Sequence, residues 1–209
     1  MRISAPTSFG ILHLQKLIPE YIKKYPGVQV SLSLSDRFID IVAEGFDVVL
    51  RISKLADSSL IARKVAPSKL VMCASPAYLE QYGTPQVPQD LTLLPCLLYS
   101  NAPHPNRWQL SGPLGIEAVK VNGPLEADNG DILKSATLAG LGISLLPSFI
   151  VGPELCSGKL QAIMSDYAAP EISIYAVFPS RCYLSAKVRT FIDFLTESYA
   201  GDPVWDKCD

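Results

Sequence analysis

Residues 28–52 read VQVSLSLSDRFIDIVAEGFDVVLRI, and this stretch indicates the fold class. Over residues 28–34, apolar side chains alternate with polar ones, which is the pattern of a half-buried strand. We expect a short helix next, beginning at Ser35 or Asp36 and ending at the following glycine, because apolar side chains cluster between a capping residue and that glycine. Residues 47–52 then predict a second strand.

The segment before this stretch adds a strand and a helix. Residues 2–5 predict a strand, and residues 6–8 predict a turn whose hydroxyl groups are candidate helix caps. An apolar stripe with helical spacing continues to Tyr25 and keeps its phase across Pro19, which predicts one kinked helix. Strands separated by helices pair in parallel, so residues 1–52 predict a doubly wound α/β unit. Ligands bind such units at the carboxyl ends of the strands.

The rest of the chain shows the same order of strand, capped helix and buried strand. Asn129 is a candidate cap for a helix that Gly140 ends, and Pro147-Ser148 starts another helix after an apolar strand. We therefore expect two similar units, joined by two crossover strands, with a cleft between them that suits a small molecule. The other expected elements are strands at 60–65, 70–74, 96–99, 143–146 and 171–178, a strand pair around 108–113, helices from Pro76 and over 187–199, and a loose tail beyond Ala200.

Composition and motifs exclude several classes of function. With 209 residues, 48% of them hydrophobic and 18% charged, the chain predicts a globular protein. A net charge of −2 lacks the positive field that DNA binding requires, so this chain alone should not hold DNA. The sequence contains no GxSxG, HExxH, P-loop or GxGxxG motif, which argues against an enzyme. His13 and His104 lack metal-ligand spacing, and we expect no metal and no cofactor.

Five cysteines form an odd set without CxxC spacing, and the first four lie in apolar stretches. We expect these four to be reduced thiols, which favours a cytoplasmic location. No export signal is expected at the N-terminus. The charge-free segment 135–153 is as long as a membrane span, but glycine and proline residues divide it, so we expect no membrane association.

The sequence resembles the effector-binding domain of LysR-type transcriptional regulators, which is similar to periplasmic solute-binding proteins. The resemblance covers about the first 200 residues, and its blocks follow the family's order. Any single block is weak evidence, whereas the ordered set is strong. The blocks are residues 2–10 with 17–20 and 25–26, residues 34–52, residues 57–64, residues 108–113 and residues 139–151.

This resemblance implies the fold, the domains and the partners. The fold would be two Rossmann-like subdomains of the periplasmic binding protein type II-like class. Subdomain I would comprise residues 1–73 and 173–209, and subdomain II residues 74–172. The resemblance implies that a winged helix-turn-helix domain would lie N-terminal to this region in the complete protein, and we expect this sequence not to include it. Implied partners of this bacterial regulator are a small-molecule effector, a second copy in a homodimer, further copies in a full-length tetramer, promoter DNA through the missing domain, and RNA polymerase as a further candidate.

In the family, the effector is held at strand-to-helix turns and by a loop of the second subdomain. Helix starts with free N–H groups and a hydroxyl are suited to an anion, but Ser8 and Ser35 could equally be simple caps. Asp36 could cap a helix and would repel an acidic effector. The candidate ligand-binding residues are Ser8, Phe9, Ser35, Asp36, Arg51, Ser100, Asn101, Trp108, Asn129, Gly130, Pro147 and Ser148.

Two of these residues have a strong structural alternative. Arg51 ends a strand that should be buried, so we expect it to pair with an internal carboxylate or with a ligand. Trp108 has the rigid area to cover a ligand, but a tryptophan is more often part of a core.

Two other functions share the expected fold. A transporter's solute-binding protein would need an export signal or a lipid anchor. An enzyme resembling prephenate dehydratase or porphobilinogen deaminase would need catalytic carboxylates or a cofactor cysteine in the cleft. We expect a non-enzymatic regulator instead.

Overall fold

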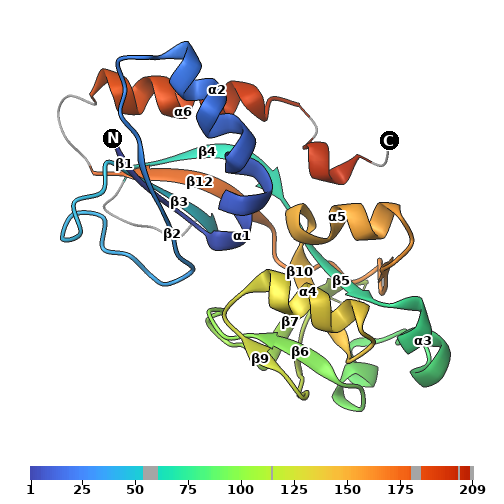
Figure 1. Ribbon diagram of the computed structural model, residues 1–209. Coiled ribbons are helices and arrows are strands. Elements are labelled where there is room, and N and C mark those ends of the chain that lie inside the picture. Colours follow the sequence, from blue (N-terminus) through green and yellow to red (C-terminus); the bar gives the residue numbers. More distant parts are fainter. Residues whose placement is uncertain (54–60, 114, 180–184, 202, 208–209) are drawn as a thin grey trace. The chain divides into compact units, whose positions relative to one another are not determined.

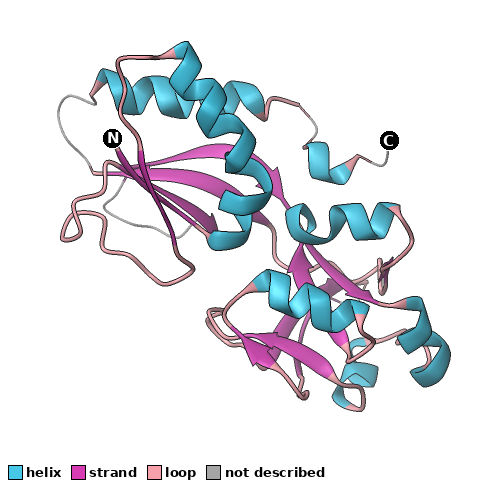
Figure 2. Ribbon diagram, viewed as in Figure 1, coloured by secondary structure: helices cyan, strands magenta, loops and turns pink. Residues whose placement is uncertain are grey.

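The computed structural model describes residues 1–53, 61–113, 115–179, 185–201 and 203–207. The chain divides into two compact units. Unit 1 comprises Met1–Ser68 and Ile172–Val204, and unit 2 comprises Lys69–Glu171 and Trp205–Asp209. Each unit contains a five-stranded sheet and its own helices (Figures 1 and 2).

The sheet of unit 1 confirms the predicted parallel start of the fold. Its strand order is β2-β1-β3-β12-β4. The first three strands are parallel, and β12 runs antiparallel to both of its neighbours. In Figure 1, the late strand β12 therefore lies in orange among strands from the start of the chain. The bounds are β1 (Arg2–Ala5), β2 (Ser31–Leu34), β3 (Val48–Ser53), β4 (Ile61–Ser68) and β12 (Ile172–Phe178).

One helical run follows β1, as the apolar stripe predicts. It consists of α1 (Thr7–Phe9), a π-helical turn η1 (Gly10–Leu14) and α2 (Gln15–Lys24). Pro19 lies inside α2. A Cβ on Gly10 would lie 2.3 Å from the side chain of Leu34, so a glycine lets the run approach the edge strand closely.

Helix α6 (Ala186–Ser198) packs beside α2 (Figure 1). The ring of Tyr21 lies 5.1 Å from that of Phe191, edge to face, and its hydroxyl donates to the Lys187 carbonyl at 3.0 Å. The prediction of an apolar face on this last helix is confirmed, because Val188, Phe191, Ile192 and Leu195 are buried.

The short helix expected after Asp36 does not form. Residues 41–45 form turns, and the Asp40 carboxylate accepts hydrogen bonds from two successive backbone N–H groups, of Val42 and Ala43, both at 3.0 Å. Aspartate favours such local turns over a helix interior. Ile39 and Ile41 are buried, whereas Phe38 is 85% exposed. The buried residues are thus two positions apart, and not three or four apart as on one face of a helix. The segment therefore buries alternate residues.

The edge strand β2 is shorter and more exposed than predicted. It begins at Ser31 rather than at residue 28, and its apolar residues Leu32 and Leu34 are both 37% exposed. Within the described part of the chain, β2 pairs along one edge, with β1.

Unit 2 repeats the arrangement of unit 1. Its strand order is β11-β5-β10-β6-β9. Strands β9, β6 and β10 are parallel, and β5 runs antiparallel to β10 and to β11. In each unit the antiparallel fourth strand is the first strand after the chain crosses from the other unit. The bounds are β5 (Leu70–Ala74), β6 (Cys96–Tyr99), β9 (Glu126–Ala127), β10 (Ile143–Pro147) and β11 (Gln161–Ala162).

The remaining elements of unit 2 also follow the sequence signals. Ser75 accepts a hydrogen bond at the start of α3, where Pro76 is the first residue. Gly140, with a positive φ of 77°, follows the end of α4. The hairpin of β7 and β8 forms a separate two-stranded sheet. The bounds are α3 (Pro76–Tyr82), the 3-10 helix η2 (Pro88–Thr92), β7 (Arg107–Gly112), β8 (Gly115–Lys120), α4 (Gly130–Leu138) and α5 (Ser148–Cys156).

The expectation of a loose tail beyond Ala200 is wrong. A 3-10 turn, η3 (Val204–Asp206), places Trp205 against α5 of unit 2. The indole is 4% exposed and lies 6.1 Å from the ring of Phe149, edge to face. A Cβ on Gly152 would lie 2.1 Å from the Trp205 carbonyl oxygen, so this glycine makes the close approach possible.

The cysteines only partly match the expectation of reduced thiols. Cys73 and Cys96 are free and buried, and burial raises the pKa of each thiol to about 12. Cys156 is disulfide-bonded, so the expectation is wrong at this position. Cys182 and Cys208 lie outside the described residues, as does Leu60 of the predicted strand 60–65.

Candidate functional site

The predicted site residues of unit 1 lie where its parallel strands end. Ala5 and Leu34 are register partners at the carboxyl ends of β1 and β2. The N–H of Ser35 donates to the Ala5 carbonyl at 2.9 Å, which holds the two turns side by side. Ser8, in the first turn of the helical run, is 4% exposed. The ends of β1 and β2 thus lie next to each other and bring the two predicted turns together.

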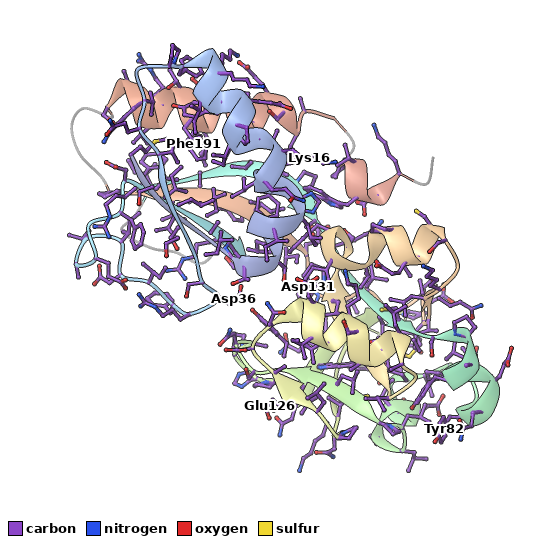
Figure 3. All side chains as sticks on the ribbon, in the orientation of Figure 1. Lys16, Asp36, Tyr82, Glu126, Asp131 and Phe191 are labelled. Carbon is purple, nitrogen blue, oxygen red and sulfur yellow. The ribbon has the colours of Figure 1, made fainter. Side chains whose placement is uncertain are left out.

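Asp36 occupies the start of this helical run. Its Oδ1 accepts a hydrogen bond from the Thr7 N–H at 2.9 Å, and Figure 3 shows the residue beside α1. The carboxylate therefore caps the helix that follows β1, rather than a helix of its own. Ser8 is not the cap, because the cap position is Pro6, which has no side-chain hydrogen bond. A negative charge thus already interacts with the positive end of this helix.

Phe9 and Arg51 make contacts within unit 1. The Phe9 ring is fully buried, 5.2 Å from the His13 ring. Arg51 donates from Nη2 to the Ile39 carbonyl at 2.5 Å, and its guanidinium lies 4.5 Å from the centre of the Phe38 ring. Burial lowers the pKa of Arg51 from its ordinary value. Among the described residues, the contacts of Arg51 are thus a carbonyl and a ring, and a role of Arg51 in ligand binding stays a prediction.

In unit 2, predicted residues again follow the carboxyl ends of parallel strands. The N–H of Ser100, after β6, donates to the Ala127 carbonyl at 2.9 Å, and Asn101 Nδ2 donates to the Asp128 carbonyl at 3.3 Å. These bonds join the loop after β6 to the loop after β9. The two loops together present backbone and amide groups at one edge of the sheet.

Asn129 caps α4, as the sequence predicts. Its Oδ1 accepts hydrogen bonds from the N–H groups of Asp131 at 3.0 Å and Ile132 at 3.2 Å. Figure 3 shows Asp131 in the first turn of this helix. At Gly130, a Cβ would lie 2.5 Å from the Ile150 side chain, so the glycine lets α4 begin against α5. The start of α4 is therefore satisfied within unit 2.

The start of α5 differs from the starts of α1 and α4, which side chains cap. Its cap residue, Pro147, makes no side-chain hydrogen bond to the helix. Ser148, the first residue of the helix, is 1% exposed, and its Oγ has no hydrogen-bond partner among the described residues. A buried hydroxyl without a partner is costly and rare in folded proteins. The first turn of α5 thus has an unused donor and acceptor next to helix N–H groups.

Trp108 belongs to the interior of unit 2. Its side chain is 7% exposed and lies in a buried cluster with Leu110 and Val119. This placement favours the core alternative for Trp108, and a role against a ligand stays a prediction.

Sequence reasoning missed the contribution of Thr7, whose N–H is the group that Asp36 caps. The signal in the sequence was Ser35-Asp36, which directly follows β2, the strand next to β1. Among the described residues, no group of three or more histidine, cysteine, aspartate or glutamate side chains could hold a metal ion. In the same part of the chain, no helix has the length and apolar character needed to span a bilayer.

Paired α/β units with polar helix starts at their strand ends are typical of two-lobed ligand-binding domains. The chain matches the family described as the LysR substrate binding domain over residues 1–200, and it belongs to that family. This membership and the solved structures below confirm the fold expected from the resemblance.

Relatives and solved structures agree with this family. The HTH-type transcriptional regulator DmlR of Escherichia coli K12 is 36% identical over 201 residues, which cover 96% of this chain and 65% of that protein. The regulatory domain of CrgA, a LysR-type transcriptional regulator from Neisseria meningitidis, has a TM-score of 0.83 at 29% identity. That match covers 96% of this chain and 98% of the CrgA domain.

Full-length AphB, a virulence activator of Vibrio cholerae, has a TM-score of 0.82 at 30% identity. The match covers 95% of this chain and 68% of AphB. The relative DmlR is likewise a transcriptional regulator and not a component of a transporter, which favours the regulatory reading over the solute-binding alternative. The chain spans 65% of the length of DmlR.

Proposed function

We propose that this chain is the effector-binding part of a LysR-type transcriptional regulator. Unit 1 corresponds to regulatory subdomain I and unit 2 to regulatory subdomain II. A small metabolite binds to this chain and is released unchanged, so the chain is not an enzyme. The complete regulator acts in the cytoplasm and contacts promoter DNA through an N-terminal winged helix-turn-helix domain.

The start of α5 is the observation that supports this proposal most directly. Ser148 has a buried hydroxyl without a partner among the described residues, in a first turn that has no side-chain cap, and its own N–H donates to the Lys69 carbonyl at 2.8 Å. An oxygen of the effector would accept a hydrogen bond from this hydroxyl, and the helix dipole favours a negative charge there. A carboxylate group fits this position.

Unit 1 favours a different part of the effector. Asp36 already places a carboxylate at the helix start beside Ser8 and Ser35. A second carboxylate would be repelled there, whereas a hydroxyl or ammonium group would be attracted. The start of α5 thus favours a carboxylate, and the turn beside Asp36 favours a hydroxyl or ammonium group. Small hydroxy acids and amino acids carry both kinds of group and are the effector class that we propose.

Binding would change the regulator through differential affinity. A ligand that binds one conformation of the chain more tightly than another stabilises that conformation. A coupling free energy of about 1–3 kcal/mol between effector binding and DNA binding is enough to change the affinity of an oligomer for DNA. The proposed oligomer is a dimer of this domain and a tetramer of the complete regulator, with RNA polymerase as a further candidate partner.

A thermal-shift screen tests the effector class. Small hydroxy acids, amino acids, plain carboxylates and sugars are added to the purified chain, and the unfolding midpoint is measured. We expect a midpoint increase with at least one hydroxy acid or amino acid and none with sugars. An absence of any increase across the panel would reject the proposed function.

Ser148→Ala then locates the site. Removing a buried hydroxyl without a partner should leave the midpoint of the free chain unchanged or slightly higher, while the shift caused by the effector becomes smaller. Ser157→Ala is the matched control, because Ser157 lies at the other end of α5 and is exposed. Ser8→Ala with Ser35→Ala should also reduce the shift. An unchanged shift in all these variants would place the ligand elsewhere.

A further inference from the structure

The hairpin of β7 and β8 has one buried face and one solvent face. Trp108, Leu110 and Val119 point into the core of unit 2. Strand alternation therefore places Arg107 and Lys120 on the opposite face, and both are exposed.

Arg107 and Lys120 lie directly opposite each other across this hairpin. The next pair along, Asn106 and Val121, is hydrogen-bonded, with the Val121 N–H donating to the Asn106 carbonyl at 3.0 Å. Because the two pair types alternate, Arg107 and Lys120 form a non-hydrogen-bonded pair, in which side chains are closest. Opposed Cβ atoms lie about 4.5–5.5 Å apart, and like charges at that position are destabilising.

Nearby acidic side chains do not neutralise this pair. Within the described part of the chain, the salt bridges do not include Arg107 or Lys120. Glu117, on β8, instead accepts a hydrogen bond from Gln89 Nε2 at 2.8 Å. A chain with a net charge of −2 thus places two cations side by side on one hairpin, without a salt bridge to any residue that the structure describes.

A hollow lies at the same place. It has a volume of about 320 Å³ and is lined by Asn106, Arg107, Ala118 and Lys120. Ala118 is on the same face as Lys120, two residues away, and its small side chain leaves space between the cations. The lining therefore combines a guanidinium, an ammonium and a side-chain amide around an open volume.

We propose that this hollow binds the phosphate group of a small phosphorylated molecule. Arginine offers a fork of donors and lysine a compact charge, and both are established phosphate-binding groups. A phosphate monoester carries close to two negative charges at neutral pH, which matches two cations, whereas a carboxylate carries one. The hollow is open to solvent, so a group attached to the phosphate can extend outwards.

This anion site is separate from the proposed effector site, because Arg107, Ala118 and Lys120 belong to the two-stranded sheet and Asn106 directly precedes it, whereas Ser148, Ser8 and Ser35 follow the ends of parallel strands. Because the two sites share no residue, a ligand can bind at one site while the other is empty. The two proposals therefore fail independently.

Nuclear magnetic resonance titration of the isotope-labelled chain tests the proposal. Inorganic phosphate, pyrophosphate and acetate are added separately at constant ionic strength and at about pH 8, where phosphate is mainly doubly charged. We expect saturable shifts of the Arg107, Ala118 and Lys120 amide signals, with an affinity for phosphate or pyrophosphate at least tenfold above that for acetate. Equal responses to all three anions, or shifts that do not saturate, would overturn the proposal.

Charge-removing variants complete the test. Arg107→Gln and Lys120→Gln should each weaken phosphate binding at least tenfold, whereas Lys159→Gln, at an exposed lysine of the same unit, should not. Without added anion, Lys120→Gln should unfold at the same temperature as the unmodified chain or a higher one, because a repulsion is removed. Unchanged phosphate affinity in both hairpin variants, or a lower unfolding temperature for Lys120→Gln, contradicts the assignment.

Discussion

At the residue scale, Asp36 is a helix cap supplied from outside the helix. Its carboxylate satisfies the Thr7 N–H, which has no partner within the helix. We expect Asp36→Ala to lower the free energy of unfolding by about 1 kcal/mol, the usual cost of losing such a cap. Urea unfolding followed by circular dichroism measures the change.

Asp36→Asn is the control for this prediction, because the amide oxygen can still accept the hydrogen bond but the charge is gone. It should be less destabilising than the alanine variant. It should also raise affinity for effectors with a second carboxylate, if repulsion from Asp36 limits them. Equal stability of the alanine variant and the unmodified chain would show that the cap contributes nothing.

The hydrogen bonds of Asp47 predict that the stability of the protein depends on pH in the acid range. Burial raises the pKa of this carboxyl, but hydrogen bonds from the Arg2 N–H at 2.7 Å and from Lys187 Nζ at 3.2 Å outweigh that effect, and the pKa lies below its ordinary value of 3.8. A lowered folded-state pKa stabilises the protein above the unfolded value, and this contribution is lost as the pH falls through the folded value.

We therefore expect Asp47→Asn to cost about 1 kcal/mol near neutral pH, the usual contribution of one hydrogen bond. The difference from the unmodified chain should shrink below about pH 4. Urea unfolding over a series of pH values measures it. Asp166→Asn, at an exposed aspartate of unit 2, is the control and should change little. A difference that stays constant down to the acid limit would contradict the prediction.

Single residues also show the limit of sequence reasoning about the site. The Asn129 cap was predictable because a capping residue and its helix are adjacent in the chain. The Asp36 cap was not, since donor and acceptor are 29 residues apart and meet only because β1 and β2 are neighbours. For the same reason the sequence could state that Arg51 needs a partner but could not identify the Ile39 carbonyl.

At the element scale, η3 fixes the end of the chain to α5. Trp205→Ala should lower the free energy of unfolding by about 3–5 kcal/mol, as usual for a large aromatic side chain removed from a core. Val204→Ala is the matched control, because Val204 is 64% exposed in the same turn, and it should change stability by about 0.5 kcal/mol or less. Chemical denaturation compares the two.

Limited proteolysis gives a second measurement for this turn. Cleavage after Ala200 should be slow in the unmodified chain and fast in the Trp205→Ala variant, because an undocked segment is accessible. Equal cleavage rates would mean that the indole does not hold the turn in place.

Elements with a strong periodic signal were predictable, and those that depend on distant contacts were not. The helices α4 and α6 carry a cap or a continuous apolar face in their own sequences. Residues 38–42 contain four apolar side chains that could suit a helix, but the Asp40 turn and the burial of Ile39 and Ile41 decide otherwise. The tail after Ala200 is short and polar apart from Trp205 and its neighbours, so its docking depends on a surface of α5 that no local pattern reveals.

At the scale of the whole molecule, we expect the chain to form a dimer in solution. The helical run of unit 1 exposes Ile11 and Ile22, and the neighbouring edge strand β2 has one unpaired edge and partly exposed leucines. Such a surface favours association. Size exclusion with light scattering should give a mass twice that of one chain.

A charged variant tests which surface is used. Ile22→Glu should shift the mass towards that of a single chain. Ile116→Glu, at an isoleucine exposed on β8 and remote in sequence from the helical run, should leave the mass unchanged. A monomeric unmodified chain at high concentration contradicts the prediction, and so does an unchanged dimer in the Ile22→Glu variant.

The position of β12 in its sheet has a consequence for synthesis on the ribosome. Among the described strands, β4 pairs only with β12, and β12 also pairs with the edge of β3 that faces away from β1. The ribosome must therefore synthesise the chain beyond Phe178 before all five strands of the unit 1 sheet can pair. The five strands of the unit 2 sheet all lie between residues 70 and 162, so they are synthesised earlier. Translation thus leaves two strand edges open to wrong pairing until late, the stage at which a chaperone would matter most.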